Sequence, residues 1–169
     1  MHHLDRRARR AALLPLALAA LVAATPSVAD AATPRPKLTV RVKHRTLVVE
    51  GGRADEMIWL RSPAATPFNV VVQLGLEQEH VATVHRDRFD EVVVRSGDGD
   101  DHVLIDETPG VSVPFTDTEP TTIRTGAGND SVAAGSGAED IGAGRGVDIV
   151  DGNRGDDVVA LGGDDDIVV

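Results

Sequence analysis

Apolar and polar residues alternate in short segments along the first half of the chain. Leu38–Val42 shows this period of two, and the apolar segment Thr46–Glu50 follows after the polar turn 43–45. Four further runs rich in β-branched residues follow at Met57–Leu60, Phe68–Leu74, His80–Val84 and Glu91–Val94. Segments of this composition, spaced by roughly 8–12 residues, are typical of strands in all-β proteins. The pattern therefore predicts an all-β fold for the body of the chain.

From residue 125 onward, the chain has a period of nine residues. Thr125–Val169 divides into five units without a gap, and Ser96–Leu104 fits the same frame. We call the nine positions of a unit columns one to nine. In the six units, columns two and four carry glycine five times each, with Asn153 and Asp164 as the exceptions. Column eight is always Val or Ile, and column six is always acidic: Asp101, Asp130, Glu139, Asp148, Asp157 and Asp166. A phase this strict predicts repetitive β structure built on turns, rather than a disordered Gly/Asp-rich tail.

These columns resemble the hemolysin-type (RTX) calcium-binding nonapeptide, G-G-x-G-x-D-x-U-x. The resemblance implies a parallel β-roll, a β-solenoid in which each unit is half a coil, so that unit n stacks on unit n+2. It also implies Ca²⁺ as the cofactor, bridged by Asp130 and Asp148, by Glu139 and Asp157, and by Asp148 and Asp166. The metal-site residues implied in this way are Asp101, Gly126, Gly128, Asp130, Gly135, Gly137, Glu139, Gly144, Gly146, Asp148, Gly155, Asp157, Gly162 and Asp166.

The chemistry of the columns agrees with this expectation. Glycine permits the positive φ of a tight turn and lets the turn aim its backbone carbonyls at an ion. A carboxylate is a hard oxygen ligand of the kind that Ca²⁺ prefers, in sites with about six to eight oxygens. Two departures predict weaker sites, because Glu139 is one methylene longer than Asp and Asp164 replaces a turn glycine. Column one departs as well, since only Gly152 matches among the five tail units.

Charge narrows the class of partner. The chain carries 17 Lys and Arg against 27 Asp and Glu, a net charge of −10, which argues against nucleic acid and favours cations. Cysteine is absent, so disulfides and thiolate metal sites are excluded. Residues 125–169 hold ten acids against Arg145 and Arg154. We expect this segment to stay unfolded until cations neutralise it, so that ion binding and folding are one event.

An export signal is predicted at the N-terminus. Four arginines within 6–10 precede the apolar run 11–24, and the small residues 27–32 follow. This order is that of a secretory signal peptide over residues 1–31, with cleavage near Ala29–Ala32, so we expect a secreted, extracellular protein. An uncleaved membrane anchor is the alternative, and both the general and the twin-arginine export routes stay open. The rest is expected to comprise a β-rich segment 32–95, a first repeat plus insertion 96–124, and the repeats 125–169.

No motif for catalysis is present in the sequence, and we expect a protein that is not an enzyme. There is no P-loop, no G-x-S-x-G and no HExxH motif. The spacing of His80 and His85 places their rings on opposite faces of a strand. Trp59 is expected to pack in the core rather than to serve as a platform for a sugar ring.

The predicted function is that of a secreted calcium-ion-binding protein that folds on binding Ca²⁺ outside the cell. One alternative is a cell-surface adhesin or interaction module, whose recognition surface would lie within 37–95. Another is a non-catalytic fragment of a larger secreted protein. The last repeat ends at Val169 without a polar cap, and solenoids need capping units. The expected partners are therefore calcium ions, a second copy bound through this uncapped C-terminal end, or a cell-surface ligand.

Overall fold

The computed structural model describes residues 35–108, 110 and 112–169. These residues form thirteen strands and the short 3-10 helix η2 (Arg86–Arg88), so the predicted all-β class is confirmed. The strands all lie in one compact unit. The six strands predicted between residues 38 and 94 correspond to β1–β6. The predicted export signal lies outside the described residues.

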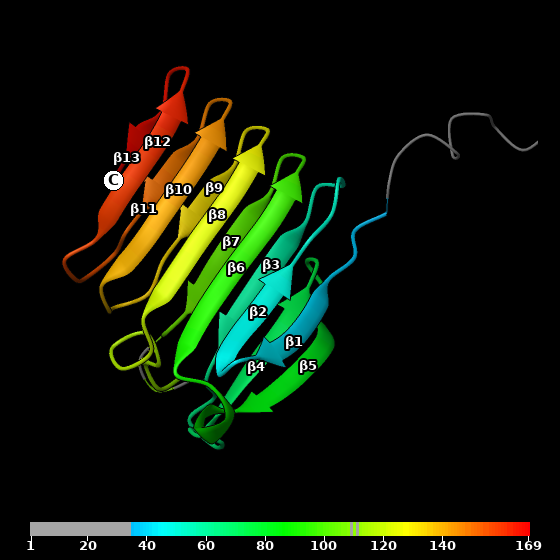
Figure 1. Cartoon of the computed structure of the whole chain (residues 1–169), viewed down its shortest axis with the longest axis vertical. Helices are drawn as coiled ribbons and strands as arrows, with labels where there is room; N and C mark the ends of the chain where they lie inside the picture. Colours follow the sequence, from blue (N-terminus) through cyan, green and yellow to red (C-terminus); the bar gives the residue numbers. More distant parts are fainter. Residues whose placement is uncertain (1–34, 109, 111) are drawn as a thin grey trace, which may run out of the picture. The chain divides into compact units, whose positions relative to one another are not determined.

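The strands form two sheets that face each other (Figure 1). The first sheet has the order β1 (Thr39–Lys43), β2 (Thr46–Glu50), β6 (Glu91–Asp98), β8 (Thr121–Ala127), β10 (Glu139–Arg145) and β12 (Val158–Gly163). The second has the order β13 (Ile167–Val168), β11 (Ile149–Asp151), β9 (Ser131–Ala133), β7 (His102–Asp106), β3 (Met57–Arg61), β4 (Asn69–Leu74) and β5 (Glu79–His85). Pairing is parallel except for the antiparallel pairs β1–β2, β3–β4 and β4–β5.

The chain passes from the first sheet to the second and back. We call a first-sheet strand together with the second-sheet strand that follows it a rung; the five rungs are β2–β3, β6–β7, β8–β9, β10–β11 and β12–β13. In the last three rungs, Ile123 pairs with Ile141 and Ile141 with Val159. Paired residues there are 18 positions apart, as in the bond between Asp130 and Asp148. Within residues 125–169, each unit therefore lies beside the second unit after it.

The core lies between the two sheets and is built from columns eight and one of the repeat. The column-eight residues Val103, Val132 and Ile141 are almost fully buried. Column one also faces inward, where Thr125 and Ala143 are fully buried. The hydroxyl of Thr125 donates a hydrogen bond to the carbonyl of Ala143 in the next rung, at 2.6 Å. The missing column-one glycines are therefore core residues, so they do not weaken the turns.

The N-terminal half contains a further repeat, which was not predicted from the sequence. Gly51–Trp59 pairs with Ser96–Leu104 in a continuous parallel register, through β2–β6 and β3–β7. In this register, Glu56 occupies column six and Ile58 column eight. The signal was present as Gly-Gly-x-x-x-Glu-x-Ile, but Ala54 stands in place of the second turn glycine.

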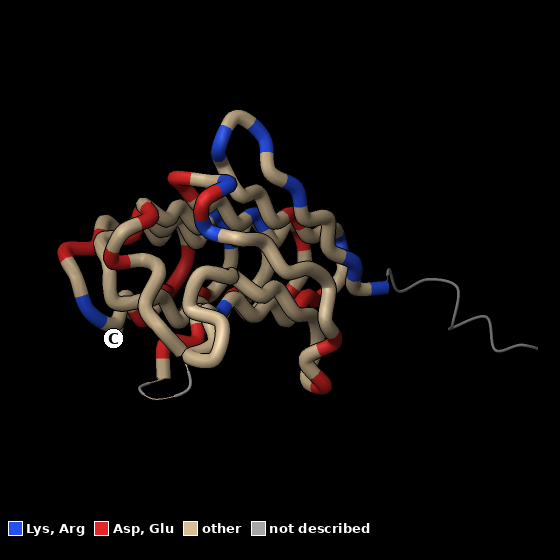
Figure 2. The backbone as a smooth tube through the Cα atoms, turned by 90° about the horizontal axis from the view of Figure 1, so that it is seen from below, with Lys and Arg blue, Asp and Glu red and all other residues tan. Residues whose placement is uncertain are grey.

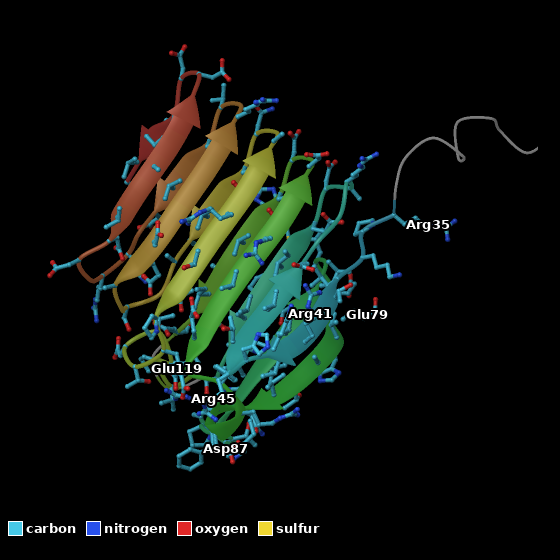
Figure 3. The ribbon with its side chains drawn as sticks, in the orientation of Figure 1. Arg35, Arg41, Arg45, Glu79, Asp87 and Glu119 are labelled. Atoms are coloured by element: carbon cyan, nitrogen blue, oxygen red, sulfur yellow. The ribbon has the colours of Figure 1, made fainter. Side chains whose placement is uncertain are left out.

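Two insertions separate the rungs and are tied to each other. The first runs from 62 to 90 and holds β4, β5 and η2, and the second is the loop 107–120. The guanidinium of Arg86 in η2 bonds the carboxylate of Glu119 at 2.6 Å, and both side chains are largely buried. Arg45 donates to the carboxylate of Asp90 and to the carbonyl of Asp87. These pairs fix the loops at one end of the sheets, where Figure 3 labels Arg45, Asp87 and Glu119.

Trp59 lies on the outer face of the second sheet, so the prediction that it packs in the core is wrong. Ile58 and Leu60 are its neighbours in β3, and both are fully buried between the sheets. Because side chains alternate along a strand, Met57, Trp59 and Arg61 point away from the core. Trp59 is accordingly absent from the buried cluster and lines a pocket.

Candidate metal centre

Five acidic side chains form a column where the chain passes from the first sheet to the second. Each carboxylate from Asp101 onward accepts a hydrogen bond from the backbone N–H of the column-six acid in the rung before it. The N···O distances are 2.8 Å for Glu56–Asp101, 2.8 Å for Asp101–Asp130, 2.8 Å for Asp130–Asp148 and 2.9 Å for Asp148–Asp166. We call these five residues the acid column. It brings four of the six predicted column-six acids together and adds Glu56.

The middle of the acid column is buried and incompletely bonded. Asp101 and Asp148 are fully buried, and Asp130 is 2% exposed. In each of the three, Oδ1 accepts the backbone N–H, whereas Oδ2 is buried without a hydrogen-bond partner among the described residues. An unpaired buried carboxylate is costly, because it loses hydration without a compensating charge. This arrangement therefore favours uptake of a proton or a cation.

Burial also changes how these acids titrate. Loss of hydration raises the pKa of Asp101 and of Asp130 to about 6, although a backbone N–H bond to each carboxylate opposes the shift. The negative charge of a neighbouring carboxylate raises the pKa further, and for Asp101 this neighbour is Glu56. These groups are thus partly protonated near neutral pH when no cation is present.

The opposite edge, where the chain returns to the first sheet, carries a smaller group of acids. The backbone N–H of Glu139 donates to Oδ1 of Asp157 at 2.9 Å, so this predicted pair is also brought together. Both carboxylate oxygens of Glu139 are buried without a hydrogen-bond partner among the described residues. Burial, and then the neighbouring Asp157, raise the pKa of Glu139. Glu107, by contrast, is occupied by the backbone N–H groups of Phe115, Thr116 and Ser136.

The turn glycines serve two different purposes. Gly126 and Gly144 both have φ of +113°, and a Cβ on Gly144 would lie 2.1 Å from the carbonyl oxygen of Gly126. Among the predicted glycines, Gly128, Gly146, Gly155 and Gly162 share the positive φ. Gly135 and Gly137 do not, which corrects the expectation of one role for all. Their Cβ atoms would instead lie 2.2 Å from Oγ1 and 2.0 Å from the carbonyl oxygen of Thr116.

The two exceptions in the glycine columns keep the turn conformation. Asn153 has φ of +65° and Asp164 has φ of +82°, both in the left-handed region. Asn and Asp tolerate this region better than most residues, since their short side chains can bond locally. Asp164 also accepts the N–H of Gly146 at 3.2 Å. The turns at both positions are therefore retained.

A second polar column, at column five, runs beside the acid column and was not identified from the sequence. Oδ1 of Asp55 accepts the N–H of Asp100 at 2.9 Å, and Oδ1 of Asp100 accepts the N–H of Asn129 at 2.7 Å. In the next step of the column, Oδ1 of Asn129 accepts a hydrogen bond from the N–H of Val147 at 2.9 Å. Here the side chain bonds the following rung, whereas in the acid column it bonds the preceding one. Each turn is thus bonded to its neighbours in both directions.

The candidate metal centre is defined by pairs of acids rather than by a cluster. Within the described part of the chain, no three His, Cys, Asp or Glu side chains form a group that could hold a metal ion. The unpaired Oδ2 atoms of Asp101, Asp130 and Asp148 nevertheless provide the hard oxygen donors that Ca²⁺ prefers. The residues present therefore fit a calcium ion, provided that backbone carbonyls supply further oxygens.

Comparison of the chain with protein-family models, with curated proteins and with solved structures gives no match. In residues 35–108, 110 and 112–169, no helix is long and apolar enough to cross a membrane.

Without Ca²⁺, we expect the protein to become more stable as the pH falls from about 7.5 to about 5. The pKa of Asp101 and of Asp130 is about 6 in the folded state, against 3.8 for an unperturbed Asp. The folded state thus binds more protons than the unfolded state in this window, and stability is lost as the pH rises through the folded pKa. Arg45 lowers the pKa of Asp90, so that group titrates below the window.

The measurement is the urea midpoint in a metal chelator at the two pH values. A midpoint that is equal or lower at the acidic pH would contradict the assignment of buried, unpaired carboxylates. The Asp130→Asn variant should show a smaller pH dependence than the wild type, because one of the titrating groups is removed.

Proposed function

We propose that this protein is a secreted calcium-binding protein whose repeats form a parallel β-roll and complete their folding when Ca²⁺ binds. The observation that carries the proposal is the row of three buried carboxylates, Asp101, Asp130 and Asp148, each with one unpartnered oxygen. Three such groups in successive rungs hold negative charges close together in a poorly hydrated edge. A divalent cation between rungs offsets that repulsion and occupies the free oxygens.

The strand register supports the β-roll. A period of 18 residues, two facing parallel sheets and left-handed residues in the turns are what a solenoid of nonapeptide pairs requires. The N-terminal hairpins then lie at one end of the roll, where β1 and β5 end the sheets with antiparallel strands. This arrangement places the hydrophobic rungs first and the acidic rungs last along the roll.

The distribution of charge supports a folding role for the ion. Basic positions gather near the beginning of the described chain, whereas the C-terminal rungs carry mostly acidic positions (Figure 2). The core also thins toward the C-terminus: Ile58 and Leu60 are fully buried, but Val168 is 53% exposed. The β12–β13 rung has little apolar burial to offset its charge repulsion, so its folding depends most on Ca²⁺.

Secretion is part of this proposal and rests on the charged, apolar and small-residue order of residues 6–32. Extracellular calcium modules bind with Kd of roughly 10⁻⁴–10⁻³ M. A site in that range is empty in the cytosol and filled outside. Because its folding depends on Ca²⁺, the tail would stay unfolded before export and would complete its folding outside the cell.

The proposal is tested by titrating the purified protein with Ca²⁺ under far-UV circular dichroism, with Mg²⁺ as the control ion. We expect part of the β signal at zero Ca²⁺, from the first two rungs, and an increase that saturates near 1 mM Ca²⁺, about the range of extracellular modules. Mg²⁺ should not produce it, because Mg²⁺ demands octahedral geometry and gives up its water reluctantly. No change up to about 10 mM Ca²⁺ would contradict calcium-linked folding.

A further inference from the structure

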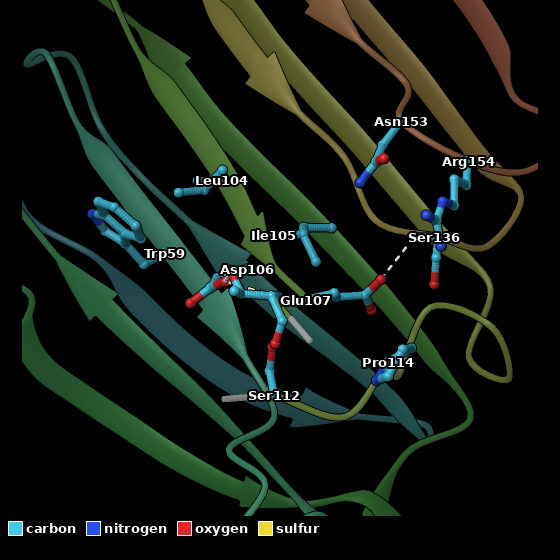
Figure 4. A pocket seen from close by; sticks show the side chains of 11 residues that line it. Trp59, Leu104, Ile105, Asp106, Glu107, Ser112, Pro114, Ser136, Asn153 and Arg154 are labelled. Atoms are coloured by element: carbon cyan, nitrogen blue, oxygen red, sulfur yellow. Dashed lines mark hydrogen bonds between the residues drawn. The ribbon is translucent and has the colours of Figure 1, made fainter. Parts of the chain in front are cut away.

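The outer face of the second sheet carries a pocket of about 580 Å³, within the usual size range of ligand sites (Figure 4). Its walls come from three parts of the chain. Trp59 and Leu104 belong to β3 and β7, Pro114 to the loop 107–120, and Arg154 to the turn after β11. A smaller hollow of about 190 Å³ shares Trp59 and Leu104 and continues along the same face.

The sheet itself creates the hollow. Trp59 pairs with Leu104 across β3 and β7, and Leu104 pairs with Ala133 on β9. The outward side chains in this row therefore decrease in size from Trp59 through Leu104 to Ala133, and Ser131 is the other outward residue of β9 on this face. This decrease in side-chain size leaves the indole of Trp59 at one side of the pocket, where Figure 4 labels it.

The polar groups of the pocket have unused hydrogen-bonding capacity. Oδ1 of Asp106 accepts the N–H of Thr108 at 3.1 Å, and its Oδ2 has no partner among the described residues. Arg154 forms no salt bridge with any residue that the structure describes, and its side chain is exposed. Figure 4 places Asn153 and Arg154 across the pocket from Trp59. The pocket thus offers a carboxylate acceptor, a guanidinium donor and an amide around an aromatic wall.

This lining selects one chemical class of ligand. An anionic ligand would meet Asp106 and a chain of net charge −10, and an organic cation would meet Arg154. A lipid would leave Asp106, Asn153 and Arg154 dehydrated and unpaired. A neutral sugar ring presents an apolar C–H face to an aromatic side chain and hydroxyl groups to carboxylate, amide and guanidinium partners.

We propose that this pocket binds a neutral oligosaccharide, with one pyranose ring against Trp59 and hydroxyl groups bonded to Asp106 and Arg154. The smaller hollow beside Leu104 and Ala133 accommodates the neighbouring sugar unit. This site is separate from the acid column and goes beyond the calcium-binding function proposed above. It gives the protein an extracellular ligand in addition to its ion.

The chain contains its own reporter for this test. Trp59 is the only tryptophan and tyrosine is absent, so intrinsic fluorescence excited at the indole comes from the pocket alone. The protein in saturating Ca²⁺ is titrated with the neutral probes cellotetraose, mannotetraose and tri-N-acetylchitotriose, and with tetragalacturonate as an anionic comparison. At least one neutral probe should change the emission in a saturable way, and tetragalacturonate should not.

Two arginine variants test the residue assignment. Arg154→Ala should weaken the binding of the active probe about tenfold, because it removes a hydrogen bond from a charged donor. Arg145→Ala is the matched control, because Arg145 is also an exposed arginine of the repeats but does not line the pocket. It should change the affinity by less than about twofold. Circular dichroism confirms that both variants are folded.

Three results would overturn the proposal. The first is an emission that no neutral probe changes up to about 10 mM, a concentration above the Kd of even weak ligands. The second is tighter binding of tetragalacturonate than of the neutral probes. The third is an equal loss of affinity in the Arg154→Ala and Arg145→Ala variants.

Discussion

Replacing Asp130 by Asn is expected to abolish most of the calcium-induced stabilisation of the central rungs without destabilising the metal-free protein. Asn keeps the oxygen that accepts the N–H of Asp101 at 2.8 Å, and it has nearly the same shape. It replaces the buried, unpartnered Oδ2 by a neutral amide, so the metal-free protein no longer buries that charge. The same change removes a charged ligand that we propose is shared by two neighbouring ion sites.

The expected size follows from linkage between binding and folding. At a free Ca²⁺ concentration about 100 times Kd, one site contributes about 2.7 kcal/mol to the free energy of unfolding. Asp130→Asn should lose most of that amount, measured as the difference between urea unfolding with Ca²⁺ and with a chelator. Asp140→Asn is the matched control, since Asp140 is an exposed acid paired with Arg124 at 2.7 Å. An unchanged calcium stabilisation in Asp130→Asn would show that the carboxylate has only a structural role.

Gly144→Ala is expected to destabilise the protein by about 3–5 kcal/mol. Gly144 has φ of +113°, and its added Cβ would lie 2.1 Å from the carbonyl oxygen of Gly126, a rigid backbone atom of the preceding rung. The new methyl group can be accommodated only if the two turns move apart. That movement would also disturb the acid column, because Asp130 and Asp148 follow these turns.

Gly163→Ala is the control for this prediction. Gly163 is the last residue of β12 and follows Gly162, the counterpart of Gly144, but it has no positive φ and no atom within 4 Å of the added Cβ. Its substitution should change stability by less than about 0.5 kcal/mol. The two variants are compared by urea unfolding in saturating Ca²⁺. Similar losses in both would contradict the close stacking of turns at the first edge.

The repeat could be predicted from the sequence because its spacing is fixed by geometry. A two-residue alternation that is interrupted every nine residues by a glycine turn predicts the inward column eight, and the resemblance to the nonapeptide repeat implies the stacking of unit n on unit n+2. The repeat unit Gly51–Trp59 was not predicted because the insertion that holds β4, β5 and η2 separates it from its partner. Paired residues are 45 positions apart there, whereas they are 18 positions apart in the tail. Its Glu56 also differs from the aspartates of the other rungs in this column.

The details of the site depended on facts that only the fold supplies. The direction of the hydrogen bonds, from each backbone N–H to the next acid, cannot be read from composition. The reasons why glycine is needed at Gly144 and at Gly135 differ, and composition does not reveal this difference either. Only Gly135 lies against a residue of the inserted loop, Thr116. The position of Trp59 could have been predicted, because strict alternation from the inward Ile58 places it outside.

The most direct test of the central claim is to count bound calcium ions by equilibrium dialysis of the wild type and of Asp130→Asn. Asp130 takes part in two stacked pairs, with Asp101 and with Asp148. We expect the wild type to bind Ca²⁺ at millimolar concentration, about the affinity of extracellular modules, and the variant to lose the ions of these two pairs. Absence of bound Ca²⁺ in the wild type, or equal numbers of ions in the two proteins, would contradict it.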